Sequence, residues 1–327
     1  MWETETIDAG RQPACLQPRG SSLYWLARDE NVEPLTDKFG RERPMRRLVC
    51  YDLEAETTRE LADGLPPSNT LAVCEDAAYT WSADRSELVR VDFSGGFETA
   101  ATLDVVAEGG LRGAGSTLFY AGELAPKVMG IAVYRPEEQQ FVRVLDTDDP
   151  THVALQLVHV EPETIWRLVH DARGWVLESR DLEGTVDIEE VITEEKLMLR
   201  WLSRTAAGFL IGGDQGVYLY DSEDGLEQVA HTDVPPDDVT EAAGHAAWVL
   251  SAITDQNGDF AEPWRVQAAP LSEAGQPSVI HETTNRIARL VGSEWGCAFF
   301  AQDTSGGLDS LLNGHPDANL VVLRPEQ

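Results

Sequence analysis

Basic residues are scarce in this sequence. Its 327 residues include 57 aspartates and glutamates but only 25 lysines and arginines, which leaves a net charge of −32. Lysine occurs only at Lys38, Lys127 and Lys196. A field of this sign repels the phosphate backbone of nucleic acids, so we expect no nucleic-acid partner. The sequence instead favours basic partners or cations, on an acidic and well-solvated surface.

Cysteines and long apolar runs are also rare. The four cysteines have no CxxC spacing and form no disulfide framework, which is typical of a reduced, cytoplasmic protein. No apolar run approaches the ~18 residues of a membrane helix, so we expect no membrane span. The first ten residues, MWETETIDAG, lack the basic and apolar regions of a secretory signal, although a removed signal peptide would leave no trace.

Segments of helical period are nearly absent, and so are catalytic motifs. The sequence has neither a phosphate-binding loop nor a GxSxG nucleophile elbow. A strand-rich chain with no such motif is expected to bind rather than to catalyse.

A four-strand pattern repeats along the chain. Between Ser68 and Leu103 the runs TLAVC, AAYTW, SELVRVDF and FETAATL are separated by turn residues, and each run has the length of a strand. Aromatic residues recur in the second strand of each repeat, at Tyr24-Trp25, Tyr79-Trp81, Phe119-Tyr120, Trp166, Phe209, Trp248 and Trp295. Seven repeats would average about 47 residues, which is typical of propeller blades.

The seventh repeat ends after its third strand, Leu320 to Leu323. The N-terminal segment Trp2 to Ile7 alternates in the manner of a strand and could supply the missing fourth strand. This closure would remove two exposed sheet edges. We therefore predict a single all-β domain over residues 1–327, a seven-bladed β-propeller closed by its N-terminal strand, with six or eight blades as alternatives.

The segment AAYTWSADRSELVRVDFSGGFETAATL, from Ala77 to Leu103, resembles bacterial propeller repeats of the YWTD/TolB type. Those repeats place an aromatic pair in one strand, followed by a turn, an apolar strand, a glycine pair and a fourth strand. Residues 46–61 and 216–230 look similar. The resemblance implies the propeller fold, and it implies little chemistry because one fold hosts many functions.

Long connections mark one face of the predicted propeller. Strands alternate in direction, so the second-to-third connections and the blade-to-blade connections emerge on the same face. Three second-to-third connections are long: Asp29 to Met45, Asp255 to Pro263 and Gln302 to Asn319. They belong to blades 1, 6 and 7, which are neighbours in a closed propeller. Long loops on a rigid scaffold are a usual place for binding.

Charged residues on these loops are the candidate partner-binding set. They are Lys38, Arg41, Arg43, Asp303, Asp309 and His315. One interpretation is a bipolar recognition surface for a protein partner, and the other is loops that are solvated or pair with one another.

One loop also carries oxygen ligands at alternate positions, namely Asp255, Asn257 and Asp259. Such spacing can aim oxygens at a calcium ion, although Phe260 stands where an EF-hand needs glycine. The alternative is an ordinary polar turn without a cofactor.

The sequence thus predicts a non-catalytic binding or scaffold propeller that docks a protein partner on the loops of blades 6, 7 and 1. One alternative is a lactonase- or lyase-type enzyme with a metal at the mouth of the central channel. Another is a structural subunit of a larger assembly.

Overall fold

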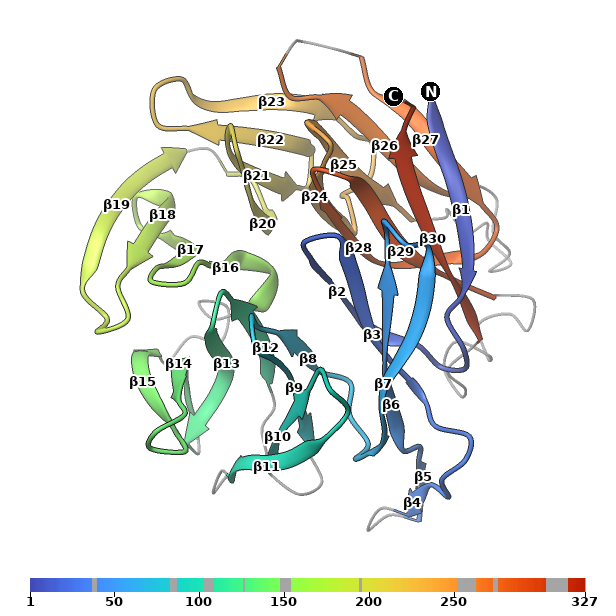
Figure 1. Ribbon diagram of the computed structural model, residues 1–327. Coiled ribbons are helices and arrows are strands. Elements are labelled where there is room, and N and C mark those ends of the chain that lie inside the picture. The colour runs from blue at the N-terminus through green and yellow to red at the C-terminus, as the bar shows by residue number, and fades with distance from the viewer. Residues whose placement is uncertain are drawn as a thin grey trace. The chain divides into compact units, whose positions relative to one another are not determined.

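Antiparallel strands make up nearly all of the computed structural model in Figure 1. It describes residues 1–36, 40–82, 87–102, 109–125, 127–147, 154–193, 196–251, 263–272, 276–303 and 317–326. Within these ranges the one helical element is the 3-10 turn η2 (Leu155–Leu157). The same ranges contain no helix with the length and hydropathy that a membrane span needs.

Seven four-stranded sheets form a seven-bladed β-propeller, which confirms the predicted fold class. Blade 1 consists of β2 (Ala14–Arg19), β3 (Ser22–Arg28), β6 (Arg46–Asp52) and β7 (Thr57–Leu65), and blade 2 consists of β8 (Leu71–Val73), β9 (Ala77–Ser82), β10 (Glu87–Asp92) and β11 (Phe97–Thr102). Blade 3 consists of β12 (Gly109–Ala114), β13 (Thr117–Ala125), β14 (Val128–Arg135) and β15 (Gln140–Thr147), and blade 4 consists of β16 (Val158–Val160), β17 (Ile165–Asp171), β18 (Gly174–Arg180) and β19 (Val186–Thr193).

Blades 5 to 7 follow the same order. Blade 5 consists of β20 (Leu199–Thr205), β21 (Gly208–Gly213), β22 (Gly216–Asp221) and β23 (Gly225–His231), and blade 6 consists of β24 (Asp238–Ala242), β25 (His245–Leu250), β26 (Trp264–Pro270) and β27 (Ser278–Thr283). Blade 7 consists of β28 (Arg286–Ser293), β29 (Gly296–Gln302), β30 (Ala318–Pro325) and β1 (Trp2–Asp8).

The N-terminal strand closes blade 7, as predicted. β1 pairs antiparallel with β30, in a register that runs from Trp2 opposite Pro325 to Asp8 opposite Asn319. The guanidinium of Arg324 donates a hydrogen bond of 3.1 Å to the Glu5 carboxylate across this pair. The two ends of the chain therefore complete one sheet, and β30 has no exposed edge.

Middle strands are apolar on both faces because neighbouring blades pack against each side. β29 reads GCAFFAQ and is buried over its first six residues. The outer strand β19, by contrast, is mostly exposed and carries charges between its apolar residues. Separate apolar clusters fill the spaces between blades 5 and 6 and between blades 6 and 7. Matching clusters lie between blades 2 and 3 and between blades 3 and 4.

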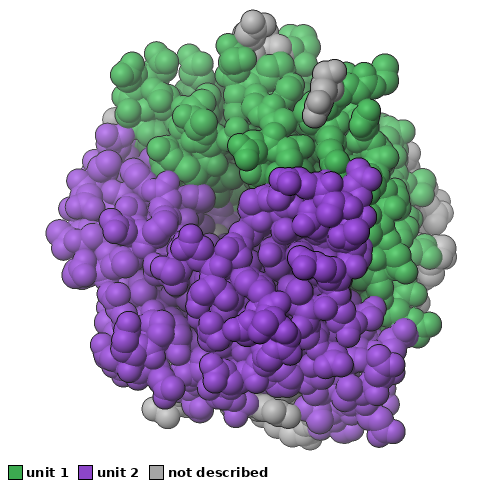
Figure 2. Space-filling view, in the orientation of Figure 1, with its two compact units in different colours: residues 1–16, 192–327 green, residues 17–191 purple. Residues whose placement is uncertain are grey.

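The chain divides into two compact units. Unit 1 comprises residues 1–16 and 192–327 and holds blades 5 to 7, and unit 2 comprises residues 17–191 and holds blades 1 to 4 (Figure 2). The boundaries fall inside β2 and β19. A single domain over residues 1–327 therefore stays a prediction.

The predicted long loop of blade 1 contains a small hairpin, β4 (Leu35–Thr36) paired with β5 (Glu42–Arg43). Its base is closed by a 2.9 Å hydrogen bond from the Asp29 amide to the Met45 carbonyl. Most of the other two loops, at 252–262 and 304–316, lies outside the described residues.

Candidate functional site

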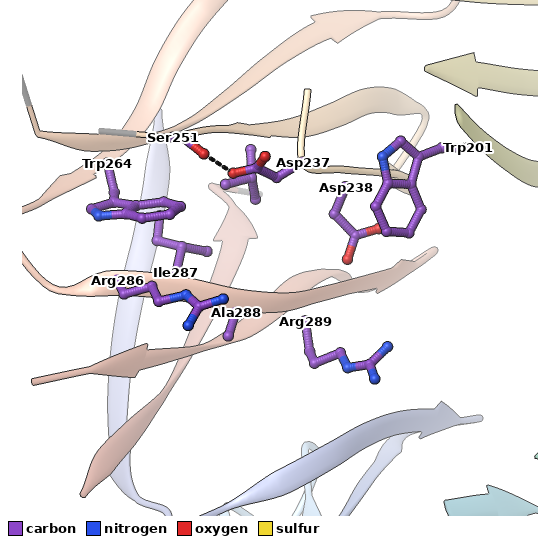
Figure 3. Close-up of a pocket in the computed structure, with 10 residues that line it drawn as sticks. Trp201, Asp237, Asp238, Ser251, Trp264, Arg286, Ile287, Ala288 and Arg289 are labelled. Carbon is purple, nitrogen blue, oxygen red and sulfur yellow. Dashed lines mark hydrogen bonds between the residues drawn. The ribbon is translucent and has the colours of Figure 1, made fainter. Parts of the chain in front are cut away.

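A cavity of 490 Å³ lies in unit 1, where the first strands of blades 5, 6 and 7 begin. These strands lie against one another in the order β20, β24, β28. In the view of Figure 3, Trp264 and Trp201 stand at opposite ends of the lining, with Asp237, Asp238 and Arg286 between them. Two aromatic rings and several charged groups thus share one pocket.

The cavity opens at the face predicted to carry the connections. Asp237 lies just before β24, and Ser251 lies just after β25, where the second-to-third connection of blade 6 begins. The Ser251 hydroxyl donates a short hydrogen bond to the Asp237 carboxylate (Figure 3). The Asp237 amide also donates to the Val249 carbonyl at 3.0 Å. Both kinds of connection therefore meet at one face of blade 6, as the alternation of strand direction predicted.

Trp201 is held in place by a hydrogen bond and by a glycine. Its indole Nε1 donates to the carbonyl of Pro236 at 3.2 Å, which links β20 to the segment that leads into β24. A Cβ on Gly212, the residue paired with Trp201, would lie 2.8 Å from Val239 and 3.1 Å from the indole. The absence of a side chain at Gly212 therefore lets Trp201 pack down onto β21.

A β-bulge in β28 places two arginines along one pocket. Arg286 and Arg289 are three residues apart, so a regular strand would point them to opposite faces. The register of β28 against β29 shifts between Ala288 and Val291, where two residues face one residue of the partner strand. Arg289 has a φ of +60° at this point, a conformation that costs a non-glycine residue about 1–2 kcal/mol. Both arginines consequently line the cavity.

Asp238 fastens the bulge to the neighbouring blade. Its Oδ2 accepts a hydrogen bond of 3.1 Å from the Leu290 amide, and its Oδ1 accepts one of 3.0 Å from the Val239 amide. Leu290 is one of the two bulged residues, and an extra residue in a bulge falls outside the regular ladder of hydrogen bonds. A half-buried carboxylate of blade 6 thus supports the arginine-bearing strand of blade 7.

The arginines differ from the aspartates in their partners. Both arginines are exposed, and neither makes a hydrogen bond or ion pair with any residue that the structure describes. The protein has 57 acidic and 25 basic residues, so carboxylates are abundant. Two arginines in one cavity that make no ion pair with a described carboxylate are therefore unexpected. The site can therefore offer two guanidinium groups to a bound anion.

The predicted partner-binding residues are only partly described. Lys38, Asp309 and His315 lie outside the described residues, as do the predicted calcium ligands Asp255, Asn257 and Asp259. Arg41 and Arg43 belong to the β4–β5 hairpin region of unit 2. Asp303 is exposed in unit 1, where its amide donates to the Asp317 carbonyl at 3.2 Å. The partner surface and the calcium site therefore stay predictions. In the part of the chain that the structure describes, no three His, Cys, Asp or Glu side chains gather to hold a metal ion.

Sequence reasoning missed the arginine pair and the two aspartates. Both sets occur where a repeat begins, as VPPDDV at residues 234–239 and NRIARL at residues 285–290. Charged residues at the start of two neighbouring first strands were the available signal. The bulge had no signal, because it depends on a contact between blades.

Comparisons with known proteins support the fold. No protein-family model and no curated protein matches the sequence. Among solved structures, a streptogramin B lyase matches with a TM-score of 0.61 and 8% identity, over 99% of this chain and 97% of that one. An oligogalacturonate lyase from Vibrio parahaemolyticus matches with a TM-score of 0.59 and 10% identity, over 99% and 97%.

The β-propeller domain of the Trilobed protease from Pyrococcus furiosus matches with a TM-score of 0.60 and 9% identity, over 88% of each chain. Identities this low establish the fold alone. The similar structures are β-propeller proteins, and they include enzymes. The YWTD/TolB character of the repeats remains a resemblance.

Proposed function

We propose that this chain is a non-catalytic binding β-propeller that takes its ligand in the pocket of unit 1. The main support for this proposal is that one cavity of 490 Å³ is lined by Trp201, Trp264, two aspartates and two arginines. Ligand pockets are concave, partly aromatic, and supplied with a few placed polar groups. The cavity also opens at the face where connections of blades 6 and 7 meet, and connections on a rigid scaffold commonly carry binding.

The use of the two carboxylates favours binding over catalysis. Asp237 accepts a hydrogen bond from Ser251, and Asp238 accepts from two backbone amides. Both are thus engaged in holding the site together. No histidine, cysteine or lysine is among the described lining residues, so a general base would have to be one of these two engaged aspartates.

A ligand panel tests this proposal. Purified protein would be titrated, by calorimetry, with neutral sugars, sugar acids, amino acids, short peptides, nucleotides and inorganic phosphate. We expect at least one class to bind, and we expect Trp201→Ala to abolish the binding. Trp166→Ala, in β17 of unit 2, is the matched control and should bind normally. The proposal fails if no class binds, or if Trp201→Ala binds as well as the original chain.

A protein partner on the loops of blades 6, 7 and 1 extends the same proposal. Deleting residues 304–316, which leaves β29 and β30 intact, while replacing Lys38, Arg41 and Arg43 should abolish pull-down of such a partner without lowering the melting temperature. Unchanged pull-down would reject the loop surface. Native mass measurement tests the remaining scaffold alternative, a structural subunit of a larger assembly.

An enzyme is the second candidate, because two of the similar solved structures are lyases that match over nearly their whole length. A lactonase- or lyase-type propeller would carry a metal at the mouth of its central channel. A stoichiometric metal ion in the purified protein would favour this candidate, and its absence under metal-replete growth would favour the binding module.

A further inference from the structure

We propose that the pocket of unit 1 binds a sugar acid, a ring-bearing monocarboxylate with several hydroxyl groups. This inference rests on the proposed function and names the ligand class of the same site. The carboxylate is held by Arg286 and Arg289, the hydroxyl groups donate to Asp237, and the ring packs beside the tryptophans.

The arginines supply the anion-binding part of the site. Arg286 and Arg289 line the cavity, and no described residue supplies either one with a carboxylate. A guanidinium group presents parallel N–H donors that match the two oxygens of a carboxylate. The net charge of −32 repels anions elsewhere on the molecule, so a bound anion would have few competing sites.

The backbone of β28 is arranged to present the second arginine. The bulge between Ala288 and Val291 turns Arg289 toward the pocket that Arg286 already lines. The left-handed conformation at Arg289 is unfavourable for an arginine, and such conformations concentrate at ligand sites. The hydrogen bond from the Leu290 amide to Asp238 stabilises this backbone.

The aspartates favour a ligand with a single negative charge, and they favour hydrogen-bond donors elsewhere on that ligand. Ionised carboxylates accept hydrogen bonds and repel other anions, so Asp237 and Asp238 disfavour a phosphate dianion in the same cavity. A carboxylate has about four lone-pair positions, and the hydrogen bond from Ser251 uses only one of those on Asp237. Hydroxyl groups of a ligand can donate to the rest.

The tryptophans and the cavity size fit a ring. Trp201 and Trp264 stand at opposite ends of the lining, and an indole offers a flat apolar surface on which the C–H face of a sugar ring can pack (Figure 3). The volume of 490 Å³ lies within the range of small-molecule sites, about 300–1,000 Å³. Carboxylate, hydroxyl groups and an apolar ring face occur together in a uronic acid.

Calorimetric titration with matched sugar pairs tests the inference. The probes are D-galacturonate, D-glucuronate and D-mannuronate, each beside its neutral sugar, together with inorganic phosphate. We expect at least one uronate to bind and its neutral counterpart to bind at least about tenfold more weakly, because the neutral sugar lacks the charge-assisted hydrogen bonds.

Arginine variants locate the binding. Arg286→Gln and Arg289→Gln should each weaken uronate binding by about tenfold to a hundredfold. Arg289→Lys keeps the charge and loses the paired donors, so it should fall between Arg289→Gln and the original chain. Arg200→Gln is the matched control, since Arg200 is exposed in the same unit and does not line the cavity. All four variants change exposed side chains, and their melting temperatures confirm folding.

Each contrary result has a separate meaning. Equal binding of a uronate and its neutral sugar, binding of phosphate alone, or uronate binding that ignores the arginine variants would overturn the inference. The failure of all three uronates would also overturn it. If another class from the ligand panel then bound and depended on Trp201, the binding function would stand without the sugar acid. If no class bound, both proposals would fall together.

Discussion

The backbone amide of Leu290 donates a hydrogen bond of 3.1 Å to Oδ2 of Asp238, and this bond joins blade 7 to blade 6 at the edge of the pocket. The amide belongs to a bulge, where an extra residue leaves the regular ladder. The acceptor belongs to the first residue of β24. One carboxylate therefore satisfies a backbone donor of the neighbouring blade and fixes the strand that carries both arginines.

Replacing Asp238 tests this link. Asp238→Ala should destabilise the protein by about 1–3 kcal/mol, because the Leu290 amide loses its acceptor in a half-buried place. Hydrogen exchange at the Leu290 amide should accelerate at the same time. Asp238→Asn keeps one acceptor oxygen, so it should lose less stability and less protection of the Leu290 amide from exchange. Unchanged protection of Leu290 in Asp238→Ala would show that the bond does not hold the bulge.

Gly212 is expected to be intolerant of any side chain. Gly212→Ala would place its Cβ 2.8 Å from Val239 and 3.1 Å from the Trp201 indole, so one of these neighbours must move. We expect a loss of about 1–3 kcal/mol in urea unfolding, typical of overpacking. Gly96→Ala is the control, since no atom lies within 4 Å of its added Cβ. Equal midpoints for the two variants would contradict the role of Gly212.

The fold was predictable because its signals are local. Alternating and apolar runs, the recurrent aromatic residues and the turn residues all repeat within a single blade, and each blade obeys the same period. The closure of blade 7 was predictable for a related reason: the last repeat lacks a strand, and Trp2 to Ile7 has the pattern of one. Its pairing beside Leu320 to Leu323 is confirmed.

The pocket was not predictable because it depends on contacts between blades. Arg286 and Arg289 have the odd spacing that points side chains to opposite faces of a strand. Only the bulge brings them together, and the bulge is held by Asp238 from another blade. Ser251 and Asp237 meet at one face of blade 6, as the alternation of strand direction predicted, and the use of this face for binding stays a prediction.

A buried ion-pair network stabilises blade 4 and gives a third prediction. The Glu178 carboxylate accepts hydrogen bonds from the Nε of Arg167 at 2.7 Å and from the Nε of Arg180 at 2.5 Å. Arg167 and Glu178 are 7% and 8% exposed, so both charges are largely removed from water. Burial alone would raise the pKa of Glu178, but hydrogen bonds from Arg180 and Arg167 outweigh it and hold this pKa below its ordinary value.

Glu178→Gln should therefore cost about 3 kcal/mol near neutral pH, because it removes the negative charge that Arg180 and the buried Arg167 both contact. A carboxylate with a depressed pKa stabilises the fold above its unfolded pKa, about 4.3, and loses this effect as pH falls through the folded pKa. The difference in unfolding free energy between Glu178→Gln and the original chain should accordingly become smaller in acid. Glu189→Gln is the control: its pair with Arg173 is largely exposed, and its replacement should change unfolding by less than about 1 kcal/mol. Equal losses of stability in Glu178→Gln and Glu189→Gln would contradict the stabilising role of the buried network.

His281 gives the last prediction, a dependence of stability on pH. The imidazole lies in β27 of blade 6 and packs against Phe299 of blade 7, with ring centroids 5.2 Å apart. Burial lowers the pKa of His281 below its ordinary value. The unfolded chain therefore takes up the proton first as pH falls below about 6.5, and the folded state loses stability from there down to the folded pKa.

Replacing His281 should flatten part of this dependence. His281→Gln removes the titrating group, so its unfolding free energy should fall less than that of the original chain between pH of about 7.5 and about 5. Urea unfolding at several pH values in this window measures the difference, above the range where most carboxylates titrate. The matched variant His231→Gln changes a side chain that is 69% exposed on β23, so it controls for the loss of one histidine from the chain. A slope that His281→Gln leaves unchanged would mean that the contact between blades 6 and 7 tolerates a charged imidazole.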